Sequence, residues 1–164
     1  MSMERKLVMG NEAIALGAVR AGVRMVAGYP GTPSTEILET VAKHNDGSIH
    51  VEWSTNEKAA MEVGAGAAYA GARTLVTMKQ VGLNVASDPL MSLAYVGVKG
   101  GMVIVSADDP GPISSQTEQD LSLIHISKAS TTRTTPLTIL RTRSTSPPKS
   151  ACPGVSMILI LVPL

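Results

Sequence analysis

Aromatic residues are almost missing from this sequence. Its 164 residues include no Phe, a single Trp and three Tyr. A core without large rings has to be built from Ala, Val, Leu, Ile and Met, so helices and strands must approach one another closely. The length suits one domain of ordinary size.

Cysteine is nearly absent as well, because Cys152 is the only one. A single thiol excludes a disulfide framework and a thiolate metal cluster within the chain. We therefore expect a reducing, cytoplasmic location. The charged first residues precede no long apolar run with a cleavage site, so no secretory signal is expected. No run approaches the roughly 20 apolar residues of a membrane helix, so no membrane partner is expected.

Acidic residues are missing from the last 44 positions. All 13 lie in residues 1–120, where nine Lys or Arg leave a net charge of −4, whereas residues 121–164 carry five basic residues and a charge of +5. The net charge of +1 is therefore the sum of an acidic part and a basic part. Basic residues in the first part are scattered with few aromatics between them, so we expect no nucleic-acid partner.

Helical patterns alternate with short apolar runs up to about residue 106. Capping residues support the helices, with Asn11 expected to cap the first, Ser34 or Thr35 the second, and Thr55 or Asn56 the third. This alternation predicts an α/β fold, in which a parallel sheet is flanked by helices on both faces. The expected helices are 10–22, 34–44, 56–72 and 83–98, the last interrupted at 88–89, and the expected strands are 23–29, 49–53, 73–78 and 101–106.

Regular patterning ends near Asp120. Residues 121–164 are rich in Ser and Thr and show no period of 2 or 3.6 residues. The segment LSLIHI at 121–126 resembles the translated end of a sequencing-library adapter, which predicts that the natural reading frame is lost there. A genuine disordered tail is the alternative. We therefore expect a domain at 1–120 and an irregular, disordered or frame-shifted tail at 121–164.

Polar turns follow the first two expected strands, and ligands of open α/β sheets bind beyond strand carboxyl ends. Glu57 is the first candidate, as a carboxyl that hydrogen-bonds a ligand nitrogen; the alternative is simple stabilisation of a helix N-terminus. The loop Pro30-Gly31-Thr32 is the second. Gly31 lets a ligand approach the backbone and Thr32 offers a hydroxyl, although an ordinary proline turn fits equally.

Other sites are disfavoured by spacing. Gly64 and Gly66 fail as a dinucleotide motif, since Tyr69 occupies the third glycine position and the pair lies inside an expected helix. The three histidines are not spaced as ligands. Asp108 and Asp109 precede a Pro-Gly-Pro turn and are more typical of a solvated loop, so no metal site is predicted.

Four blocks together resemble the alpha subunits of indolepyruvate ferredoxin oxidoreductases, which are thiamine diphosphate-dependent 2-oxoacid:ferredoxin oxidoreductases. The resemblance covers about residues 1–120. It implies the pyrimidine-binding fold of thiamine diphosphate enzymes, here incomplete. The blocks are GYPGTPSTE at 28–36, EWSTNEKAA at 52–60, TMKQVGLNVASDP at 77–89 and SADDPGPISSQTEQD at 106–120.

The resemblance also implies roles for individual residues. Glu57 would be the catalytic carboxyl that contacts the aminopyrimidine ring of thiamine diphosphate and shares a proton with it. Tyr29, Pro30 and Gly31 would lie near the reactive end of the cofactor, and Thr32 would face the substrate carboxylate. Pyruvate-specific relatives use an arginine from beyond the fourth strand to bind substrate, and residues 106–112 contain none.

The implied activity is oxidative decarboxylation of an aryl 2-oxoacid such as indolepyruvate to an acyl-CoA, with electrons passed to ferredoxin. Pyruvate or another 2-oxoacid is an alternative substrate, and a non-catalytic assembly domain is an alternative function. The family's diphosphate-binding domain with Mg²⁺, its 4Fe-4S clusters and its beta subunit would lie outside these residues. The chain is therefore expected to be a fragment that is inactive alone.

Overall fold

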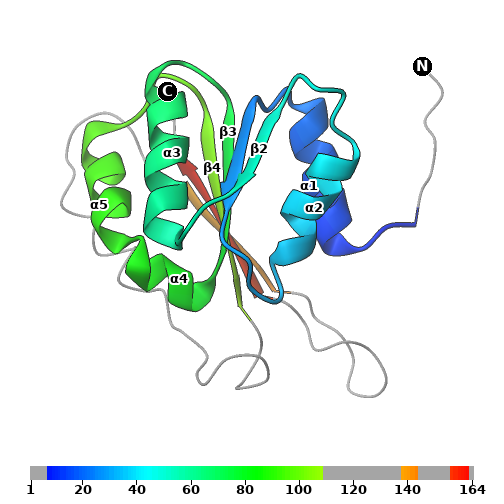
Figure 1. The fold of residues 1–164 in the computed structure, drawn as a ribbon. Helices are drawn as coiled ribbons and strands as arrows, with labels where there is room; N and C mark the ends of the chain where they lie inside the picture. The colour runs from blue at the N-terminus through cyan, green and yellow to red at the C-terminus, as the bar shows by residue number, and fades with distance from the viewer. Residues whose placement is uncertain (1–6, 109–137, 144–155, 163–164) are drawn as a thin grey trace.

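The computed structural model describes residues 7–108, 138–143 and 156–162. Four parallel strands lie side by side in the order β2-β1-β3-β4 (Figure 1). The strands are β1 (Met25–Gly28), β2 (His50–Trp53), β3 (Thr74–Lys79) and β4 (Met102–Asp108).

Helices cover both faces of this sheet. In Figure 1, α1 and α2 lie on one side, and α3, α4 and α5 lie on the other. The predicted α/β fold with a helix-flanked parallel sheet is thereby confirmed. No helix in the described part of the chain is long and apolar enough to span a bilayer. The helices are α1 (Gly10–Arg20), α2 (Thr35–Lys43), α3 (Glu57–Tyr69), α4 (Gln80–Val85) and α5 (Ser87–Val96).

The core consists of two aliphatic clusters, one on each face of the sheet. Alternate residues of a strand point to opposite faces, so each central strand supplies both clusters. Between the sheet and α1 and α2 the cluster includes Val26, Ile37, Leu38, Val41, Leu75 and Val105. Between the sheet and the other three helices it includes Met61, Val76, Met78, Leu90, Leu93 and Ile104.

Two further strands, β5 (Thr138–Arg143) and β6 (Ser156–Val162), extend the sheet beyond β4. Both junctions are antiparallel, and Ile104 of β4 pairs with Ile160 of β6. This differs from the irregular tail expected at 121–164. The continuous apolar run at 157–162 lacks strand alternation, so periodicity alone does not identify it as a strand. The rest of that segment lies outside the described residues, and its reading frame stays a prediction.

The break between the last two helices falls earlier than expected. The sequence places it at residues 88–89, whereas α4 ends at Val85 and α5 begins at Ser87. Pro89 is then the third residue of α5. Backbone N–H groups in a first helical turn have no intrahelical partner, so a proline costs little there.

Glycines within α3 have different surroundings. A Cβ built at buried Gly64 would lie 3.3 Å from the side chains of Met102 and Thr74 and even closer to Val76. A Cβ at exposed Gly66 would meet nothing within 4 Å. The close approach between helices and strands that an aromatic-poor core requires therefore occurs at Gly64, where α3 meets side chains of the sheet.

This contrast gives a matched pair of variants. We expect Gly64→Ala to lower the free energy of unfolding by about 1–3 kcal/mol, because the added methyl overpacks α3 against β3. Gly66→Ala should raise it by up to about 1 kcal/mol, because alanine favours the helix and has room. Chemical denaturation followed by circular dichroism measures both. Equal effects of the two substitutions would contradict this packing.

Candidate functional site

The carboxyl ends of β1, β2 and β3 are held together. Gly28 pairs in register with both Trp53 and Thr77. Just beyond the strands, the N–H of Ser54 donates to the Gly28 carbonyl at 2.9 Å and the N–H of Tyr29 donates to the Thr77 carbonyl at 3.4 Å. The chain leaves β1 toward one face of the sheet and β2 and β3 toward the other. This switch in direction is where open α/β sheets bind ligands.

The loop between β1 and α2, residues 29–34, is the first part of the site. The Gly31 N–H donates to Thr35 Oγ1 at 3.0 Å, and the hydroxyl and N–H of Ser34 both donate to the Gly31 carbonyl at 2.8 Å. Ser34 thus precedes α2 without capping it through its side chain. Tyr29, Pro30 and Thr32 are exposed around this fixed backbone.

Asn11 ties α1 to this loop. Its side-chain amide donates to the Pro33 carbonyl at 2.6 Å and to Glu36 Oε2 at 2.9 Å. The expectation that Asn11 caps the first helix is wrong, because the helix begins at Gly10 and Met9 occupies the N-cap position. The asparagine lies inside the first turn, so its side chain is available for a contact across the two helices.

Glu57 is the first residue of α3 and is half-buried. Asn56 caps this helix as expected, accepting the Ala59 N–H at 2.9 Å. The Glu57 carboxyl packs onto α4 at Gly82, where an added Cβ would lie 2.7 Å from Glu57 Cδ. The carboxyl therefore occupies space that any side chain at position 82 would take. Its place in the first turn also fits the alternative of helix-end stabilisation.

Lys79, the last residue of β3, adds a cation to this edge. A Cβ built at Gly31 would lie 3.1 Å from Lys79 Cβ and 3.7 Å from its Cδ, so the lysine stem passes the loop that follows β1. Both Lys79 and Gly82 lie in the 77–89 block that resembles the family, but the sequence alone predicts no role for either residue. The only local signal is a charged residue at the end of an apolar strand.

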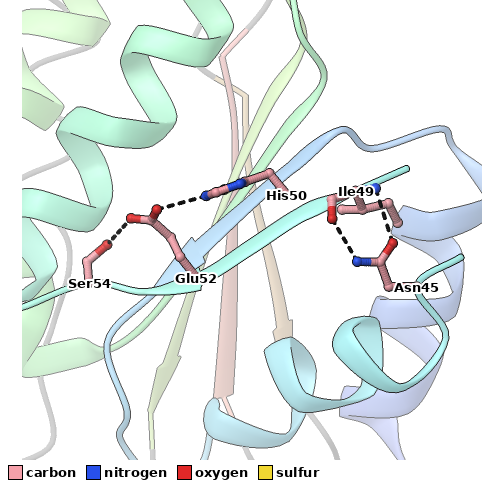
Figure 2. Close-up of polar contacts among 5 residues, drawn as sticks. All are labelled: Asn45, Ile49, His50, Glu52 and Ser54. Carbon is pink, nitrogen blue, oxygen red and sulfur yellow. Dashed lines mark hydrogen bonds and ion pairs between the residues drawn. The ribbon is translucent and has the colours of Figure 1, made fainter. Parts of the chain in front are cut away.

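Polar side chains order the edge strand that leads to Glu57. His50 Nε2 donates to Glu52 Oε2 at 2.9 Å, and Ser54 Oγ donates to Glu52 Oε1 at 3.1 Å (Figure 2). Before the strand, the Asn45 side chain donates to the Ile49 carbonyl at 2.7 Å and accepts its N–H at 3.1 Å. Both ends of β2, and hence the turn into α3, are fixed by side chains.

These contacts shift the pKa of Glu52. The His50 hydrogen bond lowers the pKa of this carboxyl, with a smaller lowering by Ser54 and an opposing effect of partial burial. A lowered folded-state pKa stabilises the fold above the pKa of the unfolded chain. That contribution is lost as the pH falls through the lowered value.

We therefore expect the unfolding free energy of the wild type to exceed that of Glu52→Gln by up to about 1 kcal/mol between about pH 5 and 6. The difference should vanish as the pH falls toward about 3. Denaturation curves over this range measure it, with Glu39→Gln, at an exposed position of α2, as the control. A difference that persists at the acid end would contradict the assignment to the Glu52 carboxylate.

Polar groups also lie at the carboxyl end of β4. Asp108 is its last residue and is buried, so the expected solvated turn is wrong for this residue, while Asp109 lies outside the described residues. The hydroxyl of Ser106 is buried and has no hydrogen-bond partner within the described part of the chain. Among the described side chains, no group of three or more His, Cys, Asp or Glu is placed to hold a metal ion.

Comparison with known proteins identifies the class. Residues 16–119 match the family model for pyruvate flavodoxin/ferredoxin oxidoreductases, thiamine diphosphate-binding. This match covers more than half of the chain, which therefore belongs to that family.

Individual members of curated protein families are similar to this chain in sequence. Indolepyruvate oxidoreductase subunit IorA of Archaeoglobus fulgidus is 52% identical over 122 residues, covering 71% of this chain and 20% of the relative. The subunit IorA of Pyrococcus abyssi is 49% identical, and the match covers 74% of this chain and 19% of the relative. The 2-oxoglutarate synthase subunit KorA of Methanothermobacter thermautotrophicus is 32% identical over 69% of the chain and 30% of its own length. The chain thus spans about a fifth of the IorA proteins that it matches.

A solved structure agrees with the fold. The 2-oxoglutarate:ferredoxin oxidoreductase from Magnetococcus marinus, with 2-oxoglutarate, coenzyme A and succinyl-CoA bound, superimposes with a TM-score of 0.63 at 26% identity. The match covers 71% of this chain and 21% of that one.

Proposed function

We propose that residues 1–120 are the pyrimidine-binding domain of a thiamine diphosphate-dependent 2-oxoacid:ferredoxin oxidoreductase that acts on aryl 2-oxoacids. The observation that carries this proposal is the Glu57 carboxyl, which lies at the carboxyl edge of the parallel sheet against the bare backbone of Gly82. The family model supports the cofactor, and about 50% identity to IorA proteins supports the substrate class.

The residues present fit thiamine diphosphate. Glu57 is half-buried, so its carboxyl is shielded on the α4 side and still open to a ligand. A carboxyl at this place can form a hydrogen bond to a nitrogen of the aminopyrimidine ring. When bound, the cofactor supplies the carbon nucleophile and the electron sink for decarboxylation. Glu57 orients the aminopyrimidine ring and moves the proton at its nitrogen.

The loop between β1 and α2 would border the reactive end of the cofactor. Tyr29, Pro30 and Gly31 supply its surface, and the fixed backbone of Gly31 allows a close approach. Thr32 is exposed beside them and would donate its hydroxyl to the substrate carboxylate. The Asn11 bond to Pro33 holds this loop to α1 and keeps it oriented.

Because this domain would supply only half of the cofactor site, a partner domain would supply the other half. A diphosphate-binding domain with Mg²⁺, a beta subunit and 4Fe-4S clusters would complete the cytoplasmic enzyme, which would use coenzyme A and ferredoxin. Residues 1–164 would be inactive alone. A 2-oxoglutarate-type or pyruvate-type enzyme is the second candidate, and the 32% identity to KorA favours it less than the IorA matches favour an aryl substrate.

The direct test replaces Glu57 by Gln in the complete oxidoreductase that contains this domain. Loss of the ionisable proton should lower kcat by about 10²- to 10⁴-fold, the usual contribution of acid–base catalysis. Substrate-dependent reduction of ferredoxin measures the rate. Glu62→Gln, on an exposed position of the same helix, is the matched control. Undiminished turnover by the Glu57 variant would exclude the catalytic role and favour an assembly domain.

A second test moves the carboxyl without removing it. In Gly82→Ala the new methyl occupies the place of the Glu57 carboxyl, which is flexible enough to shift rather than unfold the protein. We expect kcat to fall about 10- to 100-fold, as small misplacements of a reacting group do, with little change in thermal stability. Gly66→Ala is the control, because no atom lies within 4 Å of its added methyl. Normal kcat in Gly82→Ala would contradict this placement.

A further inference from the structure

A 2-oxoacid is an anion, and its carboxylate needs a positive partner in a site from which water is partly excluded. Of the four parallel strands, β1 ends in Gly28, β2 in Trp53, β4 in Asp108, and only β3 ends in a basic residue, Lys79. We propose that Lys79 binds the carboxylate of the 2-oxoacid and so helps to determine the substrate class. This inference rests on the proposed function and goes beyond the residues that it assigns.

The geometry places the lysine stem against the substrate loop. The positions of Lys79 Cβ and Cδ, 3.1 and 3.7 Å from a Cβ built at Gly31, show that the stem runs past Gly31. Thr32, whose hydroxyl would contact the same carboxylate, is the next residue of that loop. A lysine and a hydroxyl on adjacent strand ends can bind one carboxylate together.

The loop is rigid where the lysine passes it. Both the N–H and the carbonyl of Gly31 are already hydrogen-bonded, to Thr35 and to Ser34. The lysine is itself half-buried, so part of its apolar stem is covered. The absence of a side chain at Gly31 leaves the stem its path.

The nearby cation Lys58 is directed away from the substrate loop. The Lys58 ammonium donates to Asp88 at 2.9 Å and lies 3.9 Å from Glu62 on the surface of α3. The Glu57 carboxyl packs on Gly82. Residues 106–112 contain no arginine to bind a carboxylate. Among these groups, Lys79 is the cation adjacent to the substrate loop.

The test uses Lys79→Met, Lys79→Gln and Lys79→Arg in the complete oxidoreductase. Loss of a hydrogen bond to a charged group should raise the KM for indolepyruvate by about 10- to 100-fold in the Met and Gln variants. We expect kcat to change much less, and Lys79→Arg to recover most of the affinity. Lys43→Met, exposed in the last turn of α2, is the control and should leave KM unchanged.

Binding of 3-indolepropionate and of its neutral amide, measured by calorimetry without turnover, separates this inference from the proposed function. The wild type should prefer the carboxylate to the amide, and Lys79→Gln should lose that preference while binding thiamine diphosphate normally. If the Gln variant assembles and keeps both its KM and its preference, Lys79 does not bind the carboxylate. Full activity of Glu57→Gln would instead overturn the proposed function, whatever the Lys79 variants do.

Discussion

The close pairing of β1 with β3 at Gly28 is the constraint on which the site depends. A Cβ at this position would lie 2.9 Å from the Thr77 carbonyl oxygen, so any other residue at position 28 would force the end of β1 or β3 to shift. That pairing sets the loop after β1 beside Lys79, and the pairing of β1 with β2 sets the turn before Glu57 beside the same loop. Three strand ends thereby form one edge.

Glycine recurs at this edge where a side chain from another segment needs room. Gly31 leaves a path for the stem of Lys79, and Gly82 leaves space for the carboxyl of Glu57. Glycine has the same effect in the aromatic-poor interior, where the missing side chain of Gly64 allows α3 to pack directly against Val76. Small residues thus determine which groups meet, while aliphatic side chains supply most of the burial.

Much of this fold could be predicted from local patterns. Alternating apolar runs and capped helices identified the four parallel strands, and the position of Glu57 after a strand placed it at the carboxyl edge of the sheet. Contacts between distant segments could not be predicted in this way. The local sequence suggests that Asn11 caps a helix, whereas in the structure its side chain binds the Pro33 carbonyl. The strand at 156–162 is recognised only by its pairing with β4. Likewise, Gly82 lies against Glu57, and Lys79 lies against Gly31, contacts that the local sequence does not reveal.

The order of the strands in the sheet has a consequence for synthesis on the ribosome. The central strand β1 is made first, yet one of its two neighbours, β3, ends only at Lys79. Until that residue has emerged, a nascent chain exposes one side of β1 and leaves the loop after it without its final neighbour. Formation of the edge is therefore a late, non-local event, which slows folding relative to the local formation of α1 and α2.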